Sequence, residues 1–108
     1  MFSTFPEMTR PVMTEVVLPE VKFPSCVTYV RQFLPLPKIR TPADIEPNAP
    51  CEKGAALLLD YNEPHIAYIT KVSNSELCLR EGNFKKGKET FRCISISDPH
   101  IRGCWFPN

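Results

Sequence analysis

The stretch HIAYITKVSNSELCLREGNF, residues 65–84, decides the fold, because it reads as two β-strands joined by a short polar loop. β-branched and aromatic residues dominate the first half, and the Ser-Asn-Ser sequence at 73–75 is typical of a turn. A three-residue loop at 73–75 would place His65 opposite Asn83. Side chains alternate between the two faces of a strand, so His65, Glu81 and Asn83 would then share one face. A two-residue loop would shift the register by one residue and break this arrangement.

Strand-like runs flank this hairpin on both sides. GAALLLD at residues 54–60 precedes it and ETFRCISI at residues 89–96 follows it, with the turn sequences YNEP and KKGK between them. Apolar or alternating runs of this length, bounded by turn residues, predict β-strands. The sequence therefore predicts a four-stranded antiparallel meander, with TEVVL at residues 14–18 as a candidate short edge strand.

Residues 24–34 fit a helix by pattern and a strand by composition. Ser25 is a suitable N-cap, and Cys26 and Val30 fall on one helical face. The run CVTYV, however, is rich in residues that favour strands. Pro35 disfavours helical backbone at the residue before it, so a helix here would end by residue 34. The local sequence alone leaves helix and strand open.

The chain of 108 residues fits a single domain preceded by an arm. Prolines interrupt residues 1–23 too often for a helix, so we expect an extended N-terminal arm there and a folded domain over residues 24–108. Residues 35–53 contain five prolines and no sustained periodicity. They predict a long surface connection, with one helical turn at PADIE, residues 42–46.

Charge and hydropathy argue against several partners. The formal net charge is +1, so no broad field favours nucleic acid or an anionic membrane surface. No apolar stretch approaches the roughly 18 residues of a spanning helix. The first 20 residues carry charges and prolines where a signal peptide needs an apolar segment. We therefore expect no nucleic-acid partner, no membrane association and no signal peptide.

The five cysteines form no recognisable motif. They lie at positions 26, 51, 78, 93 and 104, without a C-x-x-C pair or a histidine at zinc-finger spacing. An odd count without such spacing supports neither a disulfide framework nor a structural zinc site. We expect Cys51, Cys78, Cys93 and Cys104 to be buried free thiols of the core.

The remaining cysteine belongs to a set of residues that can perform nucleophilic chemistry. Cys26 stands at a possible helix start, His65 at a strand start, and Glu81 and Asn83 on the next strand. A thiolate attacks an acyl carbon, an imidazole carries the proton, and a carboxylate or amide fixes the imidazole tautomer. A helix N-terminus would also lower the pKa of the thiol. This chemistry needs no metal and no cofactor.

Four stretches resemble the CHAP family of peptidoglycan hydrolases, relatives of the NlpC/P60 hydrolases in the papain-like group. They are SCVTYVRQFLP (25–35), EKGAALLLDYNEPHIAYITKV (52–72), LCLREGNF (77–84) and ISISDPHIRGCWFP (94–107). The resemblance implies an α+β fold in which one catalytic helix packs on an antiparallel sheet of about four to six strands. It further implies Cys26 as nucleophile, His65 as general base and acid, and Glu81 with Asn83 as the orienting groups.

The resemblance also implies a substrate and a setting. Bacterial peptidoglycan would be cleaved at an amide bond through a thioester, by an amidase or endopeptidase of phage type. Such a lysin stays in the host cytoplasm until release, or travels in the virion tail. Tyr61, Tyr68 and Trp105 are candidates to line a substrate groove, although aromatic residues beside strands more often belong to the core. His100 falls in a turn and is expected to be solvated or to cap it.

Two alternatives to a wall hydrolase remain at this point. The first is a catalytically silent virion structural protein that keeps the fold and uses the arm of residues 1–23 to dock on neighbouring virion subunits. The second is a cytosolic cysteine protease or amidase that acts on protein. The sequence does not separate these classes.

Overall fold

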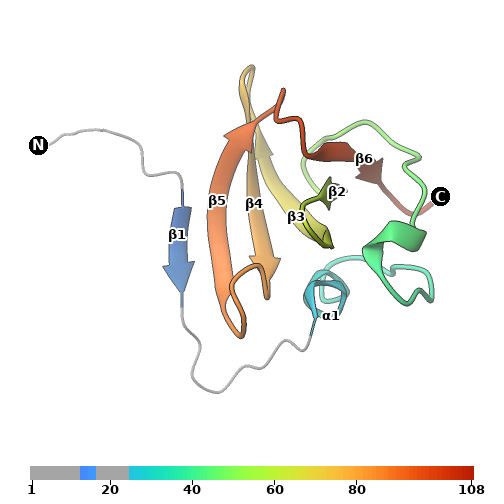
Figure 1. Ribbon diagram of the computed structural model, residues 1–108. Coiled ribbons are helices and arrows are strands. Elements are labelled where there is room, and N and C mark those ends of the chain that lie inside the picture. The colour runs from blue at the N-terminus through green and yellow to red at the C-terminus, as the bar shows by residue number, and fades with distance from the viewer. Residues whose placement is uncertain (1–12, 17–24) are drawn as a thin grey trace, which may run out of the picture.

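The computed structural model describes residues 13–16 and 25–108, of which 13–16 are described by their backbone alone. Six strands form one antiparallel sheet in the order β1-β5-β4-β3-β2-β6, and one short helix lies against it (Figure 1). Neither helix in these described ranges is long and apolar enough to cross a membrane. The elements are β1 (Met13–Val16), α1 (Cys26–Val30), the 3-10 helix η2 (Pro42–Asp44), β2 (Ala56–Asp60), β3 (Pro64–Val72), β4 (Glu76–Gly82), β5 (Glu89–Ser95) and β6 (Ile101–Trp105).

This architecture confirms the α+β class and the meander of four consecutive strands, β2 to β5. The candidate edge strand is present as β1, which pairs with β5 at the edge of the sheet. The rest of the expected arm, residues 1–12 and 17–23, lies outside the described residues. The expected turn at PADIE is η2, which begins with a capping box between Thr41 and Asp44.

The strand β6 was not expected from the sequence. It pairs with β2, the first strand of the meander, so its pairing depends on contacts that are distant along the chain. Its sequence IRGCW contains a glycine, which weakens a strand signal. The structure explains Gly103: a Cβ there would lie 2.6 Å from the Cβ of Pro47, in the connection that crosses β6.

The middle hairpin has the expected register at Tyr68 and Ile69 but a different register next to its turn. Residues 73–75 separate the strands, but the N–H of Ser73 donates to the carbonyl of Glu76 at 2.9 Å. Val72 consequently pairs with Leu77, which is the register of a two-residue loop. The three-residue register expected from the sequence is therefore wrong next to the turn.

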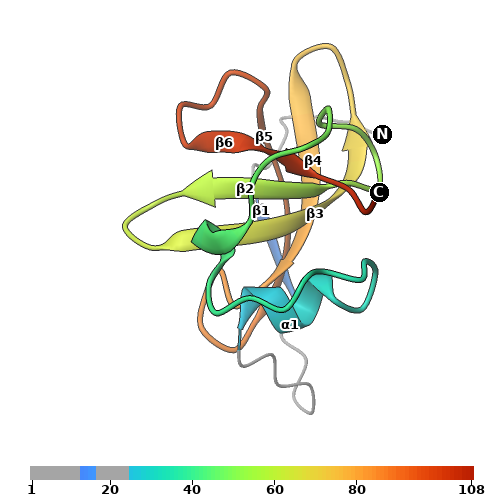
Figure 2. The same cartoon turned by 90° about the vertical axis from the view of Figure 1, so that its right-hand side faces the viewer.

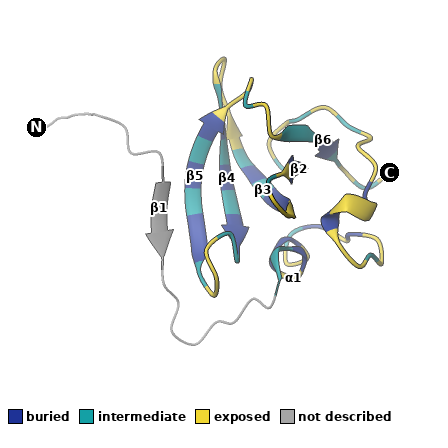
Figure 3. Cartoon of the chain, viewed as in Figure 1, coloured by how far each residue is buried: buried dark blue, intermediate teal, exposed yellow. Residues whose placement is uncertain are grey.

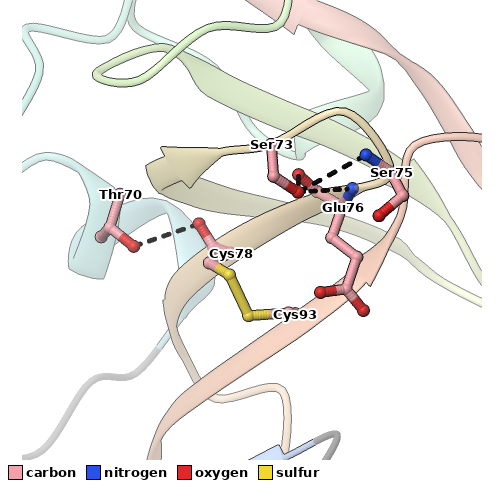
Figure 4. The surroundings of a disulfide bond; sticks show 6 residues. All are labelled: Thr70, Ser73, Ser75, Glu76, Cys78 and Cys93. Atoms are coloured by element: carbon pink, nitrogen blue, oxygen red, sulfur yellow. Dashed lines mark hydrogen bonds between the residues drawn. A yellow bond between two sulfur atoms is a disulfide. The ribbon is translucent and has the colours of Figure 1, made fainter.

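A β-bulge at Thr70 restores that register further along the hairpin. The pairing shifts between Ile69 and Lys71, and beyond the shift Tyr68 pairs with Arg80, as a three-residue loop requires. The hydroxyl of Thr70 donates to the carbonyl of Cys78 at 3.1 Å (Figure 4). The bulge brings the His65 end of β3 into the register that the catalytic arrangement needs.

The helix α1 forms at the expected place but is short. The hydroxyl of Ser25 accepts from the N–H of Thr28 at 3.1 Å, which confirms Ser25 as the N-cap. The helix ends at Val30, several residues before the proline, and continues into turns in which the N–H groups of Gln32 and Phe33 donate to the carbonyls of Tyr29 and Val30. Buried residues of α1 form one core cluster with Ala56, Leu58 and Ile66 of the sheet. Figure 3 colours the buried residues of the chain dark blue. Tertiary packing therefore decided between helix and strand.

A buried polar cluster fixes α1 on β4 and β5. The hydroxyl of Tyr29 donates to Glu89, and Arg80 donates to Glu89 at 2.8 Å and to the Tyr29 oxygen at 3.2 Å. Gly82 makes room for the tyrosine, because a Cβ at this position would lie 2.6 Å from the Tyr29 side chain. Burial and the hydrogen bond to Glu89 raise the pKa of Tyr29. Its phenol consequently stays protonated as a donor.

The sheet twists strongly and has an apolar core on each face. In Figure 2, β2 and β3 run across the view while β4 is nearly upright. One core lies between α1 and the sheet, and the other covers the opposite face. The second core contains Leu57, Leu59, Ala67, Ile69, Leu77, Leu79, Ile94 and Cys104.

The expectation of four free core thiols is wrong. Cys51 is joined to Cys104, and Cys78 to Cys93, by disulfide bonds. The Cys78–Cys93 bond crosses directly between paired positions of β4 and β5 (Figure 4). The spacing of the cysteines predicted no pairing, because the two cysteines of each bond are 53 or 15 residues apart and meet only in the folded chain. Cys26 is the one free cysteine of the five.

We predict that both disulfides stabilise the fold by restricting the unfolded chain. Replacing both cysteines of a pair by alanine should lower the free energy of unfolding by about 3 kcal/mol for Cys78–Cys93 and about 4 kcal/mol for Cys51–Cys104, whose sequence separations are 15 and 53. Urea denaturation measures both values, with Cys26→Ala as the control. A non-reducing peptide map that shows five free thiols would contradict the pairing.

Candidate active site

The structure brings three of the predicted site residues together. Cys26 begins α1, His65 lies near the start of β3, and Glu81 lies near the end of β4. His65 Nε2 lies 2.8 Å from Glu81 Oε1, and the interaction of Cys26 with the imidazole lowers the pKa of the thiol. Because Nε2 is engaged by the carboxylate, Nδ1 is the ring nitrogen that remains for the thiol. The arrangement is a cysteine–histidine pair with a carboxylate behind the histidine.

The surroundings of Cys26 favour the thiolate. Burial on its own raises the pKa of the thiol, but the hydrogen bond and positive charge of His65 outweigh it, and the pKa lies below its ordinary value. The backbone N–H groups of Ile66 and of Cys26 itself contribute in the same direction. The helix N-terminus was also expected to lower the pKa of the thiol, but α1 has only five residues. The imidazole is therefore the main activating group.

The imidazole is held in its charged form by both neighbours. Burial lowers the pKa of His65, yet the hydrogen bonds to Cys26 and Glu81 and the negative charges of these two groups raise it to about 9. The His65 ring packs beside two aromatic rings, with centroid distances of 6.2 Å to Tyr61 and 5.4 Å to Phe84. At neutral pH His65 is thus an imidazolium, and its positive charge favours the thiolate form of Cys26.

A cleft of about 580 Å³ opens at this pair. Its walls come from the start of α1, the β2–β3 loop and the end of β4, and are formed by Ser25, Cys26, Tyr61, Asn62, Glu63, Pro64, His65, Asn83 and Phe84. A cleft of this size accommodates a peptide segment or a small ligand. Both Cys26 and His65 line it, so an acyl group bound there can reach the thiol.

Asn83 lines the cleft, but its polar atoms serve the β4–β5 turn. Its backbone adopts a left-handed conformation with φ of 61°, and its side-chain oxygen accepts from the N–H of Gly87 at 2.8 Å. Its own N–H donates to the carbonyl of Lys88 at 2.8 Å. The structure thus gives Asn83 a role in shaping the cleft wall, and of the two predicted orienting groups Glu81 is the one hydrogen-bonded to the imidazole.

The three aromatic candidates separate into one cleft residue and two core residues. Tyr61 lines the cleft. Tyr68 stacks on Phe33 with a centroid distance of 4.4 Å, and Trp105 packs against the core beneath α1. Side-chain alternation explains the difference, because Tyr68 points to the face of the sheet that α1 covers.

His100 has the local role expected of it. Its Nδ1 lies 2.7 Å from Asp98 Oδ1, and its backbone N–H donates to the same oxygen at 2.8 Å. The ring lies outside the cleft against Tyr61, at a centroid distance of 4.7 Å. The second histidine of the chain therefore closes a turn and supports one cleft wall.

Sequence reasoning missed Arg92. This residue of β5 donates through Nε and Nη2 to the two oxygens of Glu81, and through Nη2 to the Tyr61 hydroxyl at 2.8 Å. A signal was available: in ETFRCISI, Arg92 shares the inward face with Thr90 and Ile94. A charged residue at an inward position of a strand needs a buried partner.

Comparisons of this chain with protein-family models, with curated proteins and with solved structures gave no match.

We predict that Cys26 reacts with iodoacetamide in the native protein at pH 6 at least tenfold faster than in the urea-unfolded chain, because a free thiol has only about 0.3% thiolate at that pH. His65→Ala should remove the difference, since it removes the counter-charge. Mass spectrometry of the labelled protein measures the rate. Equal rates for native and unfolded protein would mean that the thiol is not activated.

We predict that Asn83 acts through the backbone of the turn. Asn83→Ala should cost about 1–2 kcal/mol of folding stability, because alanine resists the left-handed conformation, while Asn83→Gly should cost less. Both variants should keep the alkylation rate of Cys26 within about twofold of the wild type. A large loss of reactivity in a fully folded Asn83→Gly variant would instead indicate a direct role beside His65.

Proposed function

We propose that this protein is a cysteine amidohydrolase or endopeptidase of papain-like fold that cleaves an amide bond of peptidoglycan. One observation carries the chemistry: Cys26 and His65 line the same open cleft, and Glu81 Oε1 lies 2.8 Å from Nε2 of His65. A carboxylate behind the histidine fixes its tautomer and orientation, as catalysis by a cysteine–histidine pair requires.

In the proposed reaction the Cys26 thiolate attacks the carbonyl carbon of the scissile amide. His65 gives its Nδ1 proton to the departing amine nitrogen as the C–N bond breaks, which leaves a thioester on Cys26. A water molecule then attacks the thioester, His65 takes its proton, and the acid product leaves with the thiolate restored. The N–H of Cys26 is available to the oxyanion that forms on the carbonyl oxygen.

The substrate class rests on the sequence motifs. The phrases around Cys26, His65 and Glu81 resemble those of the CHAP hydrolases, which act on peptidoglycan. A cleft with polar and aromatic walls suits a peptide with polar side chains. We therefore propose the stem or cross-bridge peptide of the wall as substrate, in a phage lysin or tail-associated lysin.

The disulfides support a working place outside the cytoplasm. Structural disulfides form and persist in oxidising surroundings, and a reducing cytoplasm keeps most thiols free. Two disulfides in a chain of 108 residues fit a protein that meets the cell wall from outside or after release. This placement agrees with action on peptidoglycan and argues against a cytosolic protease.

We predict that Cys26→Ala and His65→Ala each abolish wall-degrading activity, and that the double variant loses no more. Nucleophile and base act as one unit, so their effects are not additive. Glu81→Gln should retain partial activity, about 10- to 1,000-fold below the wild type, because the amide oxygen still accepts from Nε2 of the imidazole. Mass analysis of muropeptides released from purified walls measures the loss and identifies the bond.

The matched control is His100→Ala, which removes the other histidine and should leave activity unchanged. Full activity of Cys26→Ala would refute the assigned nucleophile. A wild-type protein that releases no muropeptide from several wall types, yet assembles into virions, would favour the structural alternative.

A further inference from the structure

The carboxylate that holds His65 is itself held by a buried arginine. Glu81 has no exposed surface and Arg92 is only 9% exposed. Arg92 Nε donates to Glu81 Oε2, and its Nη2 donates to Oε1 at 3.2 Å. Oε1 is the same oxygen that lies 2.8 Å from His65 Nε2. The carboxylate therefore bridges the two cations and has little freedom to rotate.

The arginine also contacts both aromatic walls of the cleft. Its Nη2 donates to the Tyr61 hydroxyl at 2.8 Å, and its guanidinium carbon lies 3.8 Å from the ring centroid of Phe84. Tyr61 and Phe84 both line the cleft. One buried side chain thus connects the carboxylate behind His65 with the surfaces that border the substrate.

Charge counting shows what the arginine contributes. In the thiolate–imidazolium state, Cys26 and Glu81 are negative and His65 and Arg92 are positive, so the four groups are neutral together. Without Arg92, the buried Glu81 carboxylate and the partly buried Cys26 thiolate would share the single positive charge of His65. Uncompensated buried charge is strongly unfavourable, and the system would avoid it by protonating the thiol.

We infer that Arg92 is a positioning residue of the proposed reaction: it fixes Glu81 behind His65 and supplies the second positive charge that a thiolate beside a carboxylate requires. The inference rests on the proposed cysteine chemistry. It adds a residue that the motifs around Cys26, His65 and Glu81 do not include.

Few other charged groups face this cluster among the described residues. Glu63 borders the cleft near Cys26 and is exposed to solvent. Asp98, in the loop after β5, interacts electrostatically with Arg92 but is paired with His100. Arg80 and Glu89 pair with each other at 2.8 Å in the separate cluster around Tyr29. Arg92 is therefore the principal partner of Glu81 other than His65.

The test measures the pH at which Cys26 becomes a thiolate, from iodoacetamide rates between pH 4 and 9. Cys26 is the only free thiol, so the readout needs no substrate. Arg92→Met should raise the midpoint by about one pH unit, and Glu81→Gln should lower it, because they remove a cation and an anion respectively. The double variant should return close to the wild-type midpoint. Arg92→Lys, which keeps the charge, should move it less than Arg92→Met.

Arg102→Met is the matched control, because it removes an arginine of β6 that donates to the carbonyls of Pro42 and Ile45, outside the cleft, and should leave the midpoint unchanged. An unshifted midpoint in Arg92→Met, or an equal shift in Arg102→Met, would overturn the inference while the proposed function stands. If Arg92→Met does not fold, the double variant provides the test instead. The inference requires its midpoint to lie above that of Glu81→Gln alone, because the double variant also lacks the arginine. A wild-type midpoint at the value of a free thiol would overturn both the inference about Arg92 and the proposed function.

Discussion

The fully buried carboxylate of Glu81 is the constraint on which the rest of the structure depends. A buried carboxylate is tolerated only where charged or hydrogen-bonding partners surround it. Its partners come from three places in the chain: His65 on β3, Arg92 on β5, and Tyr61 through Arg92. These groups meet only if β3, β4 and β5 pair in one register. The bulge at Thr70 is what makes this register compatible with a tight turn at Asn74 and Ser75.

The β4–β5 hairpin positions both members of the proposed dyad from its two faces. On one face Glu81 and Arg92 hold His65, and on the other Arg80 and Glu89 hold Tyr29 of α1, three residues after Cys26. The disulfide Cys78–Cys93 links the same two strands covalently. The relative position of thiol and imidazole thus depends on one hairpin, although neither residue belongs to it.

The sequence predicted those features that depend on local pattern. Alternating runs with turn residues gave the meander, and Ser25 gave the start of α1 because capping is a local interaction. Features that depend on pairing between distant segments were missed: β6 beside β2, and both disulfides. The hairpin shows an intermediate case, since the composition of residues 73–75 identified the turn, but the bulge depends on the packing of the whole strand.

The same distinction applies to the site. Cys26, His65 and Glu81 were found because their residue types and order carry chemical meaning. Asn83 was assigned by its place beside Glu81, whereas its left-handed backbone shows that the turn uses it. Tyr68 and Trp105 were grouped with Tyr61 by residue type. In the structure both pack against the core, because their strands turn these side chains to the face that α1 covers. Arg92 carried a signal of another kind, a charge on an inward strand position that only a buried partner explains.

The energetics of the Glu81–Arg92 pair bear on its purpose. Replacing a buried ion pair by well-packed apolar residues is often neutral or stabilising by about 1–4 kcal/mol, so a chain selected for stability alone gains little from such a pair. The Arg80–Glu89 pair differs, because Arg80 is partly exposed and Glu89 accepts the Tyr29 hydroxyl that fixes the helix. Glu81 and Arg92 contact no group of α1 by hydrogen bond, and their bonds lead instead to His65 and to the cleft wall at Tyr61. The pair is therefore better explained by the charge state it maintains at His65 than by the stability it adds to the sheet.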